Sequence, residues 1–189
     1  MPLKLLQTAV ALALAMPLQT RQAAPPAVET YEAASIDTDG NLRIVTSRHR
    51  EIVVRVPPKP SSGDEIAPTG FEAPSISNDR RAVGVLADFN GPGLTYAVPL
   101  QLVVYVAGKE HRFGGGLVVY EWHFVDGGRR VAFSQGPLHF NCSTHWELRD
   151  LRTDRLVAEV DLPEPCGQNP NPAPVPIPKW ATGPTSGIK

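Results

Sequence analysis

The chain of 189 residues has no excess of positive charge. It carries 18 lysines and arginines against 19 aspartates and glutamates, so its formal net charge is −1. Proteins that bind the phosphate backbone of nucleic acids ordinarily carry a basic surface. The balanced charge therefore predicts that nucleic acid is not a partner of this protein.

Long hydrophobic runs are missing beyond the N-terminus. No stretch after residue 23 approaches the roughly 18 apolar residues that a transmembrane helix needs, so we expect no integral membrane span after signal cleavage. No cysteine follows the N-terminal apolar run closely, which argues against a lipoprotein anchor.

The N-terminus itself has the layout of a secretory signal peptide. Lys4 supplies a positive charge, and residues 5–18 form an apolar run too short for a membrane span. Residues 1–23 are therefore predicted to be a signal peptide, which implies a periplasmic or secreted protein. The cleavage region is imperfect because Arg21 stands where a small residue is preferred, and an uncleaved anchor or a wrongly assigned start is the alternative.

Proline and glycine are abundant, with 20 and 16 copies, and they cluster. The clusters mark boundaries, because proline cannot donate to a sheet ladder. We expect a disordered linker over residues 24–40, an all-β domain over residues 41–162 and a proline-rich tail over residues 163–189, extended or disordered.

One sequence motif, called here the repeated phrase, occurs twice in the predicted β domain. "ISNDRRAVGV" begins at Ile76, and "FVDGGRRVAF" begins 48 residues later at Phe124. Around each copy, hydrophobic segments and turns predict four short antiparallel strands, over residues 73–113 and 120–162. Residues 41–56 predict an additional N-terminal hairpin. The arginine pairs in the two turns are expected to be solvated.

The two phrases resemble the strand–turn–strand segment of TolB-type and WD-type β-propeller blades. The order of motifs is also similar to a group of exported bacterial proteins of uncharacterised function, a resemblance that implies no activity. Because a closed propeller needs about four to eight blades, two copies cannot close a ring within one chain. The fold class we expect is all-β, with two four-stranded antiparallel blade-like sheets plus the N-terminal hairpin, and no closed propeller.

The hydrophobic pattern predicts how these sheets pack. "LVVYV", from Leu102, is apolar throughout and should be buried on both faces, which makes the first repeat the middle layer. In "HWELRDL", Trp146 and Leu148 share one face, while Glu147 and Arg149 are expected to face water. Trp146 is expected, with Phe133, in the core between the second repeat and its neighbour.

The segment from Leu148 to Val160 permits either a hairpin or a helix, and the repeat favours the hairpin. A turn centred between Thr153 and Asp154 would pair residues whose numbers sum to 307. Cys142 would then face position 165, next to Cys166. In an exported protein these two cysteines are predicted to form a disulfide, with free thiols or pairing between chains as the alternatives.

Two combinations of side chains suggest chemistry. His139, Cys142 and His145 lie within seven residues and include zinc-ligand types, but their spacing fits no standard zinc motif, and a surface loop between two strands is the favoured interpretation. Ser134, Ser143 and Asp150 are hydrolase-type residues, but the chain has no G-x-S-x-G motif. We therefore assign no catalytic residue, metal or cofactor, and keep His139 and His145 as weak metal candidates.

These observations favour an exported, non-enzymatic binding or scaffolding module of the cell envelope with an unknown protein or glycan partner. The alternative is a metal-binding protein or hydrolase centred on His139 and His145.

Overall fold

The computed structural model describes residues 29–58, 67–90, 95–138, 143–164, 171 and 173–183. The predicted signal peptide, His139, Cys142 and Cys166 lie outside these residues. Within the described part of the chain, no helix is long and apolar enough to cross a membrane.

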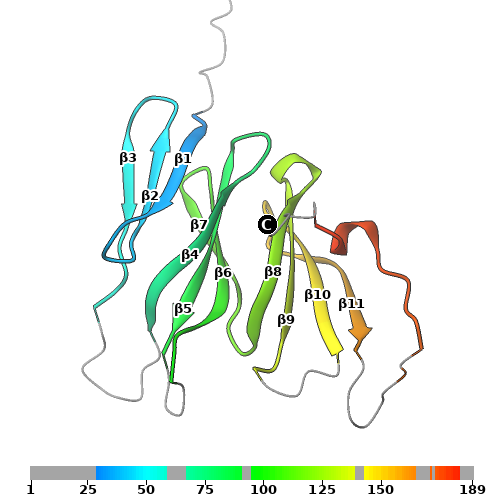
Figure 1. Ribbon diagram of the computed structural model, residues 1–189. Helices are drawn as coiled ribbons and strands as arrows, with labels where there is room; N and C mark the ends of the chain where they lie inside the picture. The colour runs from blue at the N-terminus through cyan, green and yellow to red at the C-terminus, as the bar shows by residue number, and fades with distance from the viewer. Residues whose placement is uncertain are drawn as a thin grey trace, which may run out of the picture.

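Three antiparallel sheets lie side by side as layers (Figure 1). The N-terminal sheet has the order β1-β2-β3, with β1 Tyr31–Ile36, β2 Leu42–Thr46 and β3 Glu51–Val54. The middle sheet has the order β4-β5-β6-β7, with β4 Pro68–Ile76, β5 Ala82–Phe89, β6 Val98–Val106 and β7 Lys109–Gly114. The C-terminal sheet has the order β11-β10-β9-β8, with β8 Val118–Val125, β9 Arg130–Gly136, β10 Ser143–Asp150 and β11 Leu156–Pro163. The all-β class with two four-stranded antiparallel sheets and no closed propeller is confirmed.

Strand β1 corrects the expected linker over residues 24–40. It pairs with β2, from Tyr31↔Thr46 to Ile36↔Leu42, so the N-terminal hairpin is the larger part of a three-stranded sheet. The backbone N–H of Tyr31 also donates to the carbonyl of Arg80, and the Arg80 guanidinium donates back to the carbonyls of Tyr31 and Glu32. Arg80, expected to be solvated, therefore connects β1 to the turn between β4 and β5.

The repeated phrase forms the same hairpin twice. Ile76 pairs with Val83 in the first copy, and Phe124 pairs with Val131 in the second. The two turns also contact each other, because the N–H of Asp79 donates to the carbonyl of Gly127 at 3.0 Å. In the second copy the turn contains a short 3-10 helix, η1 (Asp126–Gly128). The repetition thus produces two equivalent hairpins stacked on each other.

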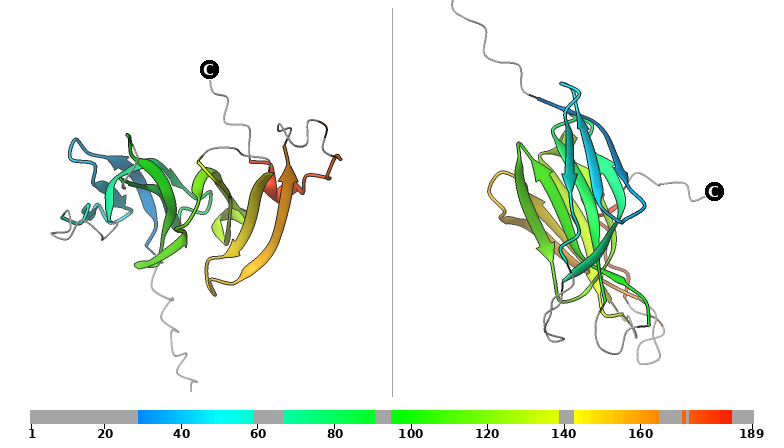
Figure 2. Two further views of the ribbon diagram at one scale, coloured as in Figure 1. Left: turned by 90° about the horizontal axis from the view of Figure 1, so that it is seen from below. Right: turned by 90° about the vertical axis from the view of Figure 1, so that its left-hand side faces the viewer.

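The middle sheet contributes to a core on each of its faces. Val83 and Val85 of β5 pack with Leu42 of the N-terminal sheet, whereas Leu86 packs in the cluster that contains Phe133 of the C-terminal sheet. Residues Leu102 to Tyr105 of β6 are all buried, as predicted for a strand covered on both sides. The views in Figure 2 agree with the order of the layers, and the first repeat is the middle layer.

Trp146 is buried, as expected, but not between the sheets. Phe133 lies in the core shared with the middle sheet, whereas Trp146 packs with Ala132 and Ala181 on the opposite face of the C-terminal sheet. That face is covered by the C-terminal segment, which forms the 3-10 helix η2 (Lys179–Ala181). The expected extended or disordered tail thus includes a docked turn, since apolar Ala181 and Trp180 cover an otherwise open apolar face.

The expected solvent face of β10 is instead the inner face. Glu147 pairs with Phe133 across the sheet and is 8% exposed. Its carboxylate accepts hydrogen bonds from Gln135 Nε2 at 2.8 Å and Arg149 Nε at 2.6 Å. These bonds compensate the loss of water around a buried charge, which is why strict alternation misassigned the face.

The hairpin of β10 and β11 is confirmed, but its predicted register was wrong by one residue. Pairs from Ser143↔Pro163 to Leu148↔Ala158 sum to 306, whereas Arg149 pairs with Leu156. Val157 is the extra residue of a β-bulge, and such an insertion shifts the register beyond it.

Candidate binding groove

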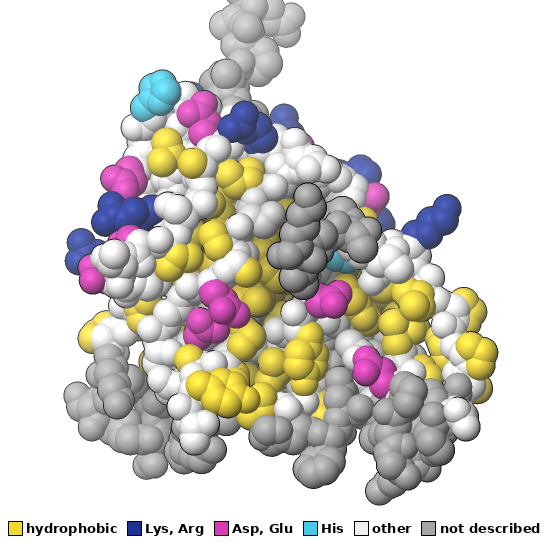
Figure 3. Space-filling model, in the orientation of Figure 1, with side chains coloured by type: hydrophobic (Ala, Val, Ile, Leu, Met, Phe, Trp, Pro, Cys, Tyr) yellow, Lys and Arg dark blue, Asp and Glu magenta, His cyan; other side chains and the backbone are white. Residues whose placement is uncertain are grey.

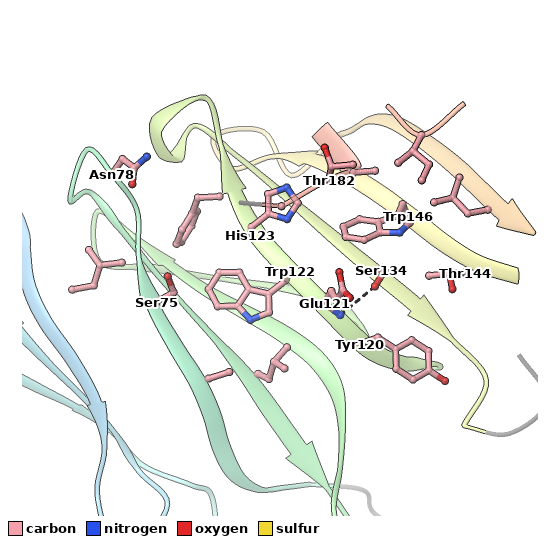
Figure 4. Close-up of a pocket in the computed structure, with 18 of the residues that line it drawn as sticks. Ser75, Asn78, Tyr120, Glu121, Trp122, His123, Ser134, Thr144, Trp146 and Thr182 are labelled. Carbon is pink, nitrogen blue, oxygen red and sulfur yellow. Dashed lines mark hydrogen bonds between the residues drawn. The ribbon is translucent and has the colours of Figure 1, made fainter. Parts of the chain in front are cut away.

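A cavity in the described residues lies between two edge strands, β4 of the middle sheet and β8 of the C-terminal sheet (Figure 4). We call it the β4–β8 groove; its volume is about 1060 Å³. Its walls come from β4, β5, β8, β9, β10, β11 and the C-terminal segment, and the residues are Ala73, Ser75, Ile76, Asn78, Leu86, Tyr120, Glu121, Trp122, His123, Phe124, Gly127, Ser134, Thr144, Trp146, Leu162, Glu164, Ile177, Ala181, Thr182 and Gly183.

Strand β8 borders the groove along its outer edge. Tyr120 to Phe124 are five consecutive residues, and all of them line the groove. Successive side chains of a strand point to opposite faces, so one groove can touch all five only if it runs along the edge of the strand. Among the described strands, β8 pairs only with β9. Its other side therefore presents backbone N–H and C=O groups to the groove.

Trp122 anchors β8 on the middle sheet. A Cβ added to Gly84 would lie only 2.4 Å from the Trp122 ring, so the indole packs against bare backbone of β5. Phe124 meets Trp122 edge to face, with 5.4 Å between ring centroids. Because Gly84 has no side chain, the two sheets can approach each other closely at this point. Trp122 and Phe124 then form the apolar wall of the groove.

A β-bulge changes the direction of the groove-lining side chains at Tyr120. Val119 pairs with Gln135 and Glu121 with Ser134, which leaves Tyr120 without a cross-strand partner. The N–H of Glu121 donates instead to Ser134 Oγ at 3.1 Å, and the Tyr120 hydroxyl donates to the carbonyl of Pro137. Tyr120 is 41% exposed, so its ring is available to a ligand in the groove.

The charges of the groove are negative. Glu121 and Glu164 contribute carboxylates, both exposed, and no lysine or arginine is among the residues that line it. Thr144 Oγ1 donates to Glu164 Oε1 at 2.6 Å. In Figure 3, lysine and arginine side chains lie along the upper, left and right margins of this face, whereas acidic and hydrophobic side chains occupy its middle. The groove therefore favours a ligand that is partly apolar and partly cationic.

Carboxylates also gather on the adjoining part of the middle sheet. Glu72 is the cross-strand partner of Leu86, which lines the groove, and Asp88 pairs with Gly70 two residues away. Burial, with a smaller contribution from the nearby Glu72 charge, raises the pKa of Asp88 to about 6. The negative charge thus continues from the groove onto β4 and β5.

His123 closes one wall by holding the C-terminal segment. Its Nε2 lies 2.9 Å from the carbonyl oxygen of Trp180, and its ring lies 5.9 Å from that of Trp146. Burial lowers the pKa of His123, opposed in part by that carbonyl contact. The neutral ring with its proton on Nε2 donates to Trp180, so His123 has a structural role in the wall.

The metal candidates do not come together in the described residues. His139 and Cys142 lie outside them, and His145 Nδ1 lies 2.7 Å from Asp161 Oδ1. His145 Nε2 is also within 4 Å of carboxylate oxygens of Glu147 and Glu159. Even so, no group of three or more histidine, cysteine, aspartate or glutamate side chains in the described part of the chain could hold a metal ion.

Two of the hypothetical hydrolase residues, Ser134 and Asp150, have other roles, and Ser143 is an exposed residue at the start of β10. Ser134 is 1% exposed, and its oxygen accepts from the backbone of Glu121. The Asp150 carboxylate accepts from the backbone N–H groups of Arg152 and Thr153 in the turn that follows β10. These interactions stabilise a bulge and a turn.

The sequence contains no motif that marks Tyr120, Glu121, Trp122 or His123 as a site residue. In "YEWHF", large side chains occur at both odd and even positions, which is unusual for a strand with one solvated face. This pattern was the available indication that the segment lines a site. No known protein-family profile matches the chain, and no curated protein shows significant similarity to it.

Proposed function

We propose that this protein is an exported, non-enzymatic binding module of the cell envelope, and that the β4–β8 groove is its ligand-binding site. The observation that carries the proposal is the groove itself, in which an edge strand, exposed aromatic surface and carboxylates converge. Concave sites with an apolar lining and a few polar groups are the usual place for ligand recognition. The resemblance to propeller blades belongs to the same proposal, supported by the two consecutive four-stranded units.

Binding can be tested by titrating the protein with hexasaccharides of N-acetylglucosamine and with short extended peptides while recording backbone amide NMR shifts. We expect shifts concentrated on β4, β8 and residues 177–183. Tyr120→Ala should weaken the interaction by at least about tenfold if its ring is a main contact. Tyr96→Ala is the matched control, because Tyr96 is 59% exposed and does not line the groove.

The proposal fails if the ligands that bind perturb amides away from the groove, or if the two tyrosine variants lose affinity equally. Conversion of a bound ligand into product would exclude the non-enzymatic part while retaining the site.

Export and the Cys142–Cys166 disulfide remain predictions. Fractionation of an exporting host should place the mature chain outside the cytoplasm, and mass analysis should show loss of the first 23 or so residues. In the chain-entropy relation the bond would stabilise the fold by about 3.5 kcal/mol. Two alkylatable thiols in the folded, exported monomer would contradict the disulfide.

A further inference from the structure

The C-terminal sheet is offset from the middle sheet by one strand. Its edge strand β8 contacts β6, and Trp122 of β8 reaches across to pack on Gly84 of β5. Strand β4 lies one position further out in the middle sheet, beyond β5. Ser75 pairs with Gly84 and Glu72 pairs with Leu86, so these two side chains of β4 point toward the side of the C-terminal sheet. Both are exposed.

We propose that the groove ligand is an extended, cationic peptide segment that adds to the free edge of β8 as a fifth strand of the C-terminal sheet. This inference rests on the proposed function of the groove and names its ligand class. A strand added to β8 would lie about 4.8 Å from it and, at the usual spacing of packed sheets of about 10 Å, opposite β4. It would therefore cover the side of β4 that β8 leaves exposed.

Main-chain pairing accounts for the location of the groove. An edge strand presents a row of backbone donors and acceptors, and binding proteins commonly use such an edge to capture an extended peptide. The groove follows Tyr120 to Phe124, so a peptide could pair along this whole stretch.

The side chains of the groove define the peptide chemistry. On one face of such a strand, alternate residues would enter the space between the sheets, which is lined by Trp122, Phe124 and Leu86. On the other face, alternate residues would lie beside Glu121 and the wall that contains Thr144. Apolar peptide residues suit the first face because its lining is apolar. Basic peptide residues suit the second face, because Glu121 has no ion pair with a described lysine or arginine.

Charge complementarity favours a peptide over a neutral glycan. Glu121 and Glu164 line the groove, and Glu72 and Asp88 lie on the adjoining strands β4 and β5. None of the four forms an ion pair with a lysine or arginine in the described residues. A cationic peptide would supply the missing counter-charges, whereas a neutral sugar would leave them unpaired. Exposed ion pairs weaken as ionic strength rises, so salt should reduce peptide affinity.

The probe for this inference is the synthetic peptide acetyl-Lys-Val-Lys-Val-Lys-Val-Lys-Val-amide, titrated into the full chain at low salt. We expect binding with shifts along β8 and slowed hydrogen exchange at alternate β8 amides. The peptide with glutamate in place of lysine should bind at least about tenfold more weakly. Glu121→Gln should weaken binding of the lysine peptide by about two- to fivefold. Glu159→Gln on β11 is the control, because Glu159 is exposed and does not line the groove.

Two N-methylated peptides separate main-chain pairing from simple charge attraction. One carries N-methyl groups on all valines, and the other on all lysines. In a β-strand, backbone N–H groups alternate in direction, so only one of the two should lose affinity, by about tenfold or more. Equal binding by both peptides would overturn strand addition.

A different outcome would overturn this inference without removing the proposed function. If the N-acetylglucosamine hexasaccharide binds at the groove and the lysine peptide does not, the site binds glycans. If neither probe binds, the peptide inference fails, while the Tyr120 and Tyr96 comparison with other ligands still tests the groove.

Discussion

The middle and C-terminal sheets present equivalent positions at Gly84 and Ala132, and these two positions are covered by different parts of the chain. Gly84 receives the Trp122 ring from the next sheet, whereas Ala132 receives Ala181 from the C-terminal segment. Phe133 and Val85, one residue further on, are both fully buried. The short docked segment thus occupies the face where a further sheet would pack if the repeat continued.

This difference explains how two copies form a stable unit without closing a ring. A further four-stranded sheet would bury a large area, whereas the residues around η2 cover only the centre of the outer face, around Trp146 and Leu148. We therefore expect the interface between the sheets to contribute more stability than the docked segment. Four predictions test this comparison, in order of decreasing effect on stability.

The largest effect is expected for Phe133→Ala. Phe133 is 0% exposed in the core between the sheets, and removing a buried aromatic ring costs about 3–5 kcal/mol in the free energy of unfolding. Denaturant unfolding measures the loss. Val157→Ala, at a residue 44% exposed on β11, should change the stability by less than about 0.5 kcal/mol. Similar losses for both variants would contradict the assigned core.

A smaller loss is expected for Gly84→Ala. The new methyl carbon would lie 2.4–2.5 Å from the Trp122 ring, and such overpacking costs about 1–3 kcal/mol. Trp122→Leu in the same chain should recover part of the Gly84→Ala loss, as a double-mutant cycle would reveal. Gly116→Ala is the control, because nothing lies within 4 Å of the added carbon there. Additive effects of the two substitutions would place Trp122 away from Gly84.

Undocking the C-terminal segment should cost about 1–2 kcal/mol, less than the loss at Phe133. Ala181→Asp places a charge against Ala132 and Leu148, and the chain can relieve this by releasing η2, which limits the loss. The pKa of His123, followed by NMR, should then rise because burial lowers it in the docked state. Lys179→Asp, at an exposed position of the same turn, is the control. An unchanged pKa of His123 in the Ala181 variant would show that the segment stays docked.

The smallest effect is a pH dependence that comes from the middle sheet. Because the pKa of Asp88 is raised to about 6, the folded protein keeps this proton at pH values where the unfolded chain has lost it. The stability contributed by Asp88 is therefore present below about pH 4 and is lost as the pH rises through about 6. Asp88→Asn should raise the stability at pH 7 by about 1 kcal/mol, after allowance for solvent screening, and have little effect near pH 4.

Glu72→Gln sharpens the same test. It removes the charge that contributes to the raised pKa of Asp88, so the pH dependence between about 4 and 6 should become shallower. An unchanged profile in both variants would exclude Asp88 as its source.

The strands after β1, their antiparallel order and the middle position of the first repeat were all predictable from the sequence, whereas β1 was mistaken for a linker. Strands such as "AVGVLADF" and "LVVYV" are visible in the sequence because the spacing of their apolar residues is a local property. That spacing indicates both the strand and whether one or two of its faces are buried. The repeated phrase likewise fixed two equivalent hairpins, because their turns have the same length and their flanking residues have the same pattern.

Which face of each strand is covered, and by which segment, depends on contacts between distant parts of the chain. Glu147 lies inward because Gln135 and Arg149 satisfy its carboxylate, and Trp146 lies outward because a segment more than 30 residues later covers it. The groove arises from the one-strand offset between the two sheets, which the contact of Trp122 with Gly84 fixes. Such contacts join residues far apart in the chain. The local pattern of apolar residues therefore gives no information on how one sheet is shifted relative to another.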